Sequence, residues 1–100
     1  MRILILGGTG EARALANALV EGGHAVTTSL AGRTSDPHRP AGDLHIGGFG
    51  GASGLAAYLR ECGYDHLVDA THPYAGIISA NAVMASALTG VPLLRLLRPA

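Results

Sequence analysis

Residues 3–15, ILILGGTGEARAL, join a short apolar run to a glycine-rich turn and then to an amphipathic segment. The run from Arg2 to Leu6 is mostly Ile and Leu, which is typical of a strand buried on both faces. From Glu11 onward, apolar residues recur at helical spacing until Gly22 and Gly23 provide a helix stop. The stretch therefore predicts a strand, a tight turn and a helix, the first unit of a parallel α/β sheet.

Strand and helix patterns alternate along the rest of the chain. A second helix is expected from Ser53, a good N-cap, to Gly63, and a third around residues 78–88, ended by Gly90 and Pro92. The other expected strands are short apolar or β-branched runs at residues 24–31, 44–46, 66–70 and 93–97. This order predicts a Rossmann-like α/β fold, a doubly wound parallel sheet built from βαβ units.

The composition limits the possible functions. The chain has 100 residues, the size of one domain, and its 48% of hydrophobic residues support a packed core. The formal net charge is zero and there is no basic run, which argues against a nucleic-acid partner. No stretch approaches membrane length, and the first residues do not resemble a signal peptide. Because Cys62 is the lone cysteine, we expect a cytoplasmic protein without an internal disulfide. The sequence does not determine the oligomeric state, and a monomer is favoured.

The glycine-rich turn lies where Rossmann-like domains bind the pyrophosphate of a dinucleotide. The sequence GTG at 8–10 matches the first half of the G-x-G-x-x-G fingerprint, but Arg13 occupies its last position. Glu11 is expected either to face the second half of the ligand or to cap the helix, and a tight turn without a ligand is the alternative. The residues expected to approach the phosphates are Gly7, Gly8, Thr9 and Gly10.

The segment after the second strand indicates which dinucleotide is bound. NAD-binding domains carry an acidic residue there for the ribose 2′-hydroxyl, whereas this chain has no acid between Glu21 and Asp36. Ser29, Arg33 and Thr34 instead suit a 2′-phosphate, because a guanidinium offers a fork of donors. The pattern therefore favours NADPH over NADH, with an exposed loop arginine as the alternative.

The loop GGFGG at 47–51 follows the third expected strand. Four glycines around Phe49 are costly to order, so a plain connector would rarely contain them. We expect backbone from Gly48, Phe49 and Gly50 to approach the ribose or phosphates of the cofactor. A mobile lid or a simple turn is the alternative.

The stretch DATHPYA at 69–75 follows the fourth expected strand and so lies at the ligand-binding edge of the sheet. Thr71 and His72 are expected near the nicotinamide, and His72 and Tyr74 are candidates for orienting the ring or donating a proton. The alternative is that His72 bonds to backbone and Tyr74 packs. The histidines show no metal-binding spacing and there is no cysteine pair, so we predict no metal site.

These motifs together resemble the precorrin-6A reductase family, whose cobalt-precorrin counterpart is similar. The resemblance covers nearly the whole chain, and the motifs after the glycine turn are the more specific ones. The stretches that carry it are LILGGTGEARALA (4–16), SLAGRT (29–34), GGFGG with GLAAYLR (47–60), DATHPYA with ISANA (69–82) and LLRLLRPA (93–100).

The resemblance implies an enzyme of cobalamin biosynthesis that reduces a double bond of the precorrin-6A macrocycle with hydride from NADPH. It also implies a second α/β domain after Ala100, so that residues 1–100 form the NADP-binding domain. The substrate bears many carboxylates, which suit bidentate arginines. Candidate substrate-binding residues are Arg13, Arg95 and Arg98.

Two other classes of function remain open at this point. A non-catalytic NADP-binding regulatory domain would need the glycine turn and Arg33 but not the Thr-His-Pro-Tyr corner. Another Rossmann-type enzyme is the second possibility. A short-chain dehydrogenase would need a Tyr-x-x-x-Lys pair, which a chain without lysine lacks, and a methyltransferase would favour an acid after the second strand.

Overall fold

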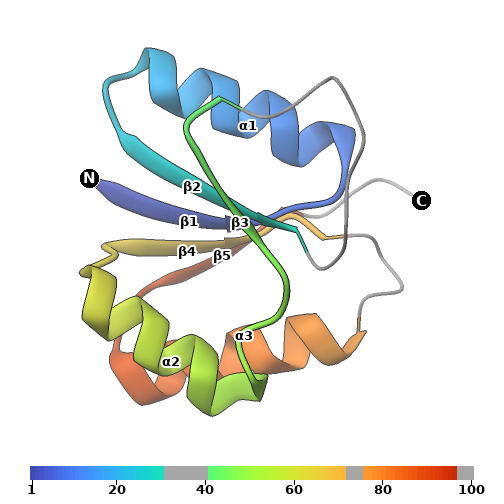
Figure 1. Ribbon diagram of the computed structural model, residues 1–100, viewed down its shortest axis with the longest axis vertical. Helices are drawn as coiled ribbons and strands as arrows, with labels where there is room; N and C mark the ends of the chain where they lie inside the picture. The colour runs from blue at the N-terminus through green and yellow to red at the C-terminus, as the bar shows by residue number, and fades with distance from the viewer. Residues whose placement is uncertain (31–40, 72–75, 97–100) are drawn as a thin grey trace.

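The computed structural model describes residues 1–30, 41–71 and 76–96, which fold into one parallel sheet flanked by helices (Figure 1). The predicted doubly wound α/β fold is confirmed, and the predicted element ends are correct to within a residue or two. In chain order the elements are β1 (Arg2–Leu6), α1 (Gly10–Glu21), β2 (Ala25–Leu30), β3 (Asp43–Ile46), α2 (Gly51–Cys62), β4 (His66–Asp69), α3 (Gly76–Thr89) and β5 (Leu93–Arg95).

The strand order β3-β2-β1-β4-β5 places β1 at the centre of the sheet. The chain builds outward from β1 to β2 and β3, and then returns to the other side of β1 with β4 and β5. Leu6 at the end of β1 pairs in register with Ser29 on β2 and with Asp69 on β4. The carboxyl ends of these three strands therefore lie level with one another at the reversal of strand order, where open α/β sheets bind ligands.

Alternate residues of β1 face opposite layers of the molecule. Ile3 and Ile5 pack in a core cluster with side chains of α1, whereas Leu4 and Leu6 pack with side chains of α2 and α3. Figure 1 shows the same arrangement, with α1 over one face of the sheet and α2 and α3 over the other. Because both faces are covered, β1 is apolar at four successive positions, as the sequence pattern predicted.

The start of α2 differs from the prediction. Ser53 was expected as the N-cap, but the helix begins at Gly51 and its N-cap is Gly50, which makes no side-chain capping hydrogen bond. Gly50 and Gly51 have φ values of 86° and 75°, which residues with a Cβ rarely adopt. The glycines let the chain turn sharply and enter the helix earlier than the capping residue indicates.

The outer surface of α3 is unusually apolar. Ala82 is fully buried against the core, yet Ile77 is 80% exposed, Met84 56% and Leu88 50%. Leu94 on the edge strand β5 is also 61% exposed. No helix in the described part of the chain is long and apolar enough to cross a membrane. Ile77, Met84 and Leu88 instead form an apolar surface on the outer side of α3, whereas Leu94, which is in register with Val68, lies on the face of the sheet that α1 covers.

Candidate functional site

The glycine turn between β1 and α1 is packed on one side and open on the other. The amide of Gly7 donates to the carbonyl oxygen of Ser29 at 2.8 Å, and a Cβ at this position would lie 2.7 Å from Cγ2 of Thr28. Gly8 has a φ of 111°, and no atom lies within 4 Å of a Cβ built there. The turn is thus held against β2 while the backbone of Gly8 and Gly10 stays exposed at the N-terminus of α1. This open backbone fits the approach of a phosphate group.

The side chain of Thr9 is used within the protein. Its hydroxyl oxygen accepts a hydrogen bond from the amide of Ala12 at 3.1 Å and donates one to the carbonyl of Ala70 at 2.8 Å. Thr9 therefore caps α1 and fastens the helix to the residue that follows β4. Of the two roles left open for Glu11, the N-cap is thus filled by Thr9, and Glu11 lies exposed in the first turn.

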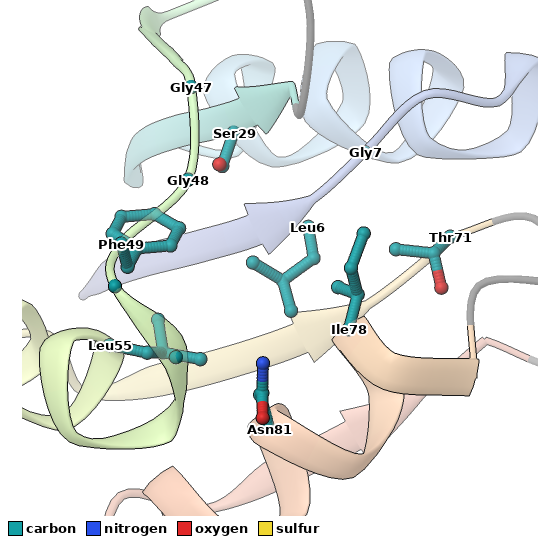
Figure 2. A pocket seen from close by; sticks show the side chains of 12 residues that line it. Leu6, Gly7, Ser29, Gly47, Gly48, Phe49, Leu55, Thr71, Ile78 and Asn81 are labelled. Atoms are coloured by element: carbon teal, nitrogen blue, oxygen red, sulfur yellow. The ribbon is translucent and has the colours of Figure 1, made fainter.

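A pocket of about 170 Å³ opens at the carboxyl ends of β1, β2 and β4 (Figure 2). Its wall combines the glycine loop 47–51 with side chains from the strands, α2 and α3. Figure 2 shows Ser29 and Asn81 on opposite sides of this space, one from β2 and the other from α3. The lining residues are Leu6, Gly7, Ser29, Gly47, Gly48, Phe49, Gly50, Gly51, Leu55, Thr71, Ile78 and Asn81.

Phe49 is held in the pocket wall by other aromatic rings. The ring of His45 on β3 stacks on it with centroids 4.4 Å apart and planes 8° from parallel, and the ring of Tyr58 on α2 lies 4.9 Å away. On the backbone side, a Cβ at Gly54 would overlap the carbonyl group of Phe49. The glycine loop is thus seated on α2, and Gly54 permits this close contact.

Asp69 organises the end of β4. It is 4% exposed, and its Oδ1 accepts hydrogen bonds from the hydroxyl of Thr71 at 2.6 Å and the amide of Thr71 at 3.2 Å. Nε of Arg95 lies 3.8 Å from Oδ2. Burial raises the pKa of this carboxyl, but hydrogen bonds from Ser79 and Thr71 and the charge of Arg95 outweigh it and hold the pKa below its ordinary value. Asp69 is therefore ionised at neutral pH and fixes Thr71.

The structure brings together many of the residues that the sequence predicted. Those lining the pocket are Gly7, Ser29, Gly48, Phe49, Gly50 and Thr71. Arg13 lies beside the glycine turn, with Nη2 4.0 Å from the position of a Cβ on Gly10. Arg95 lies at the end of β5 with about half of its side chain exposed. The remaining predicted residues, Arg33, Thr34, His72, Tyr74 and Arg98, lie outside the described residues.

Seven residues around the pocket were not predicted as site residues: Leu6, Gly47 and Gly51, which adjoin predicted ones in the sequence, and four others. Leu55, Ile78 and Asn81 line it from the two helices, and Asp69 fixes Thr71 beneath it. The signal for Asp69 was present, because an acid that directly follows an apolar strand seldom lies in a core without a purpose. The three helical residues had no such signal. Among the described residues, no group of three or more metal-ligating side chains is found.

Comparisons with known proteins identify relatives of this chain. The sequence profile of the precorrin-6x reductase CbiJ/CobK family matches residues 2–100. A precorrin-6A reductase of Rhodococcus erythropolis is 58% identical over 99 residues, which cover 98% of this chain and 40% of that protein. A cobalt-precorrin-6A reductase of Salmonella typhimurium is 34% identical over 105 residues, covering 97% of this chain and 37% of that protein.

A solved structure of CobK precorrin-6A reductase is similar throughout the chain. It has a TM-score of 0.93 and 48% identity, and the match covers 99% of this chain and 39% of the solved one. The chain thus spans about 40% of the length of the curated relatives that it resembles.

Proposed function

Because the chain belongs to the precorrin-6x reductase CbiJ/CobK family, we propose that its residues bind the cofactor of an enzyme that reduces precorrin-6A to precorrin-6B in cobalamin biosynthesis. The cofactor is NADPH, which supplies the hydride that reduces a double bond of the macrocycle. Residues 1–100 form the NADP-binding domain, and a second domain completes the substrate cleft in the intact enzyme. The protein's own tasks are to bind, orient and shield the reacting groups.

The convergence of three chain segments at one edge of the sheet carries this proposal. The glycine turn, the end of β2 and the end of β4 meet where Leu6, Ser29 and Asp69 are in register. The exposed backbone of Gly8 and Gly10 at the start of α1 suits the pyrophosphate. A dinucleotide bound there has room to extend toward β2 on one side and toward β4 on the other.

The preference for NADPH rests on the end of β2. Ser29, only 6% exposed, faces the pocket at this end, and Arg33 and Thr34 follow in the sequence. The 2′-phosphate of the adenosine ribose is the group that this set would bind, with the guanidinium as a bidentate donor. Between Glu21 and Asp36 the sequence has no acid that could accept a hydrogen bond from a 2′-hydroxyl.

Thr71 and His72 bind the nicotinamide end in this proposal. The hydroxyl of Thr71 donates its one hydrogen to the ionised Asp69, so its oxygen presents only lone pairs to a ligand. Such an acceptor suits the amide hydrogens of a nicotinamide carboxamide. His72 follows directly and orients the ring, and His72 or Tyr74 provides the proton that completes the reduction unless solvent does so.

Three arginines are proposed to bind the carboxylates of the macrocycle. The Arg13 guanidinium lies by the glycine turn, and Arg95 is only half buried beside Asp69, which leaves donors of its guanidinium accessible. Arg98 follows in the sequence. A guanidinium pairs with a carboxylate through two parallel hydrogen bonds, which fixes both position and orientation.

Cofactor titrations of the intact protein test the proposal. We expect NADPH to bind at least tenfold more tightly than NADH, and Arg33→Ala to remove most of this difference, because a charge-assisted pair contributes about 1.5–3 kcal/mol. Equal affinity for the two cofactors in the unaltered protein would contradict the cofactor assignment. Oxidation of NADPH, followed by its absorbance, should then require added precorrin-6A, and binding without turnover on any corrin intermediate would favour a regulatory domain.

A further inference from the structure

The pocket at the sheet edge contains two polar side chains that no other described residue satisfies. Ser29 is 6% exposed and Asn81 is partly buried, and neither side chain hydrogen-bonds within the described part of the chain. Thr71, the third polar side chain of the lining, already donates to Asp69. Buried polar groups in proteins are nearly always paired, so a ligand that reaches this space should bond to Ser29 and Asn81.

The rest of the lining selects the shape of that ligand. Phe49, Leu55, Leu6 and Ile78 provide apolar surface around the space. The ring of Phe49 is backed by the parallel ring of His45 at 4.4 Å, which keeps its orientation fixed. Figure 2 shows Asn81 reaching from α3 into the space between Phe49 and Ile78. A flat ring with apolar faces and hydrogen-bonding groups along one edge fits this combination.

The position of the pocket indicates which ring system of the dinucleotide, adenine or nicotinamide, binds in it. It adjoins Ser29 at the end of β2, the strand end that binds the adenosine ribose in Rossmann-like domains. It also lies under the glycine loop, between α2 and α3, in a space of about 170 Å³. Figure 2 shows Thr71, the residue proposed to contact the nicotinamide, on the opposite side of this space from Phe49, beyond Ile78. The part of the pocket between Ser29, Phe49 and Asn81 is therefore left for the adenine ring.

We propose that this pocket binds the adenine base of NADPH and that Asn81 reads the edge of the base. The inference deepens the proposed function and rests on it. The Oδ1 atom of Asn81 accepts from the exocyclic amino group of adenine, and its Nδ2 atom donates to the adjacent nitrogen of the five-membered ring. This is the bidentate pairing by which an asparagine distinguishes adenine from other bases.

A change in the base alone tests the pairing. In the hypoxanthine analogue of NADPH, a carbonyl oxygen replaces the exocyclic amino group, so both groups on that edge are acceptors and one Asn amide cannot satisfy them. The intact protein should bind NADPH about tenfold more tightly than the analogue. Asn81→Ala should weaken NADPH binding by a similar factor, leave the analogue nearly unaffected and bring the ratio of the two affinities close to one.

Asn17→Ala is the matched control. Asn17 lies on α1, across the sheet from the pocket, where its Oδ1 accepts from the amide of Ala41 at 3.0 Å, so the ratio should keep its original value. Both affinities in a ratio are measured on the same protein preparation, so a partial loss of folded protein affects both equally and does not change the ratio.

Two outcomes would overturn the inference alone: equal affinities in the unaltered protein, or an unchanged ratio in Asn81→Ala because both ligands lose affinity equally or not at all. Failure of the unaltered protein to bind either ligand would overturn the proposed function as well.

Discussion

The Thr9 hydroxyl joins two elements that are distant in sequence, and replacing it should destabilise the fold measurably. Thr9→Val keeps the shape of the side chain but removes the acceptor for the amide of Ala12 and the donor to the carbonyl of Ala70. Ala70 is 2% exposed, so water cannot readily replace the lost donor. In the variant both hydrogen bonds are lost, and a methyl group lies beside the amide of Ala12 and the carbonyl of Ala70.

The expected magnitude follows from these two contacts. Loss of a Thr N-cap costs about 1 kcal/mol. Loss of the second bond, with a buried carbonyl left unpaired, costs about 1–2 kcal/mol more. We therefore expect Thr9→Val to lower the free energy of unfolding by about 2–3 kcal/mol, and Thr9→Ser, which keeps the hydroxyl, to lower it by less than about 1 kcal/mol.

Urea titrations of the unaltered protein and the two variants give the free energy of global unfolding. Amide hydrogen exchange at Ala12 gives the free energy of local opening at the start of α1. Exchange at this amide should be faster in Thr9→Val and nearly unchanged in Thr9→Ser. If the free energy of unfolding of Thr9→Val differs from that of the unaltered protein by less than about 0.5 kcal/mol, the hydroxyl does not join α1 to the end of β4.

The remaining predictions concern the glycine loop and Asp69. Gly54→Ala should destabilise the protein by about 1–3 kcal/mol and weaken NADPH binding, because the new Cβ displaces the carbonyl of Phe49 and with it the loop. Gly76→Ala, where no atom lies within 4 Å of the new Cβ and φ is not positive, should change neither quantity. Asp69→Asn should remove a pH-dependent part of the stability: because the folded-state pKa of Asp69 is lowered, its stabilising effect is complete above its ordinary value of 3.8 and is lost as the pH falls through the folded value. Unfolding measured from neutral pH downward should therefore show the difference between the two proteins shrinking only in acid, and a difference that grows on acidification would contradict the assignment.

Much of the fold could be predicted because the local hydrophobic pattern of each strand and helix agrees with its position in the folded protein. The Ile and Leu run that forms β1 is apolar at successive positions because helices cover both faces of the sheet. The glycines and the stretch DATHPYA mark where strands end, and in a parallel sheet those carboxyl ends lie at one edge. The sequence alone therefore predicts that Gly7, Ser29, Phe49 and Thr71 lie at the site.

The helical side of the pocket could not be predicted in this way. The apolar residues of α3 surround most of the helix, so periodicity does not show which face carries Ile78 and Asn81 toward the sheet. The predicted start of α2 was also wrong, because the backbone conformation of the glycine loop and not the capping pattern determines it. Ser53 satisfied the local rule for an N-cap, but Gly50 and Gly51 adopt positive φ and turn the chain into the helix two residues earlier.

The apolar outer side of α3 has a practical consequence for protein preparation. If residues 1–100 are produced alone, Ile77, Met84 and Leu88 on α3 meet water, and so does Leu94 on β5, which is an edge strand of the sheet that the described residues form. Association of two molecules that buries these side chains would be favourable in free energy, and sulfate or phosphate in the buffer would make it more favourable. Concentrated stocks of such a fragment would cluster and precipitate, and low concentration with weakly salting-out ions would keep it dispersed.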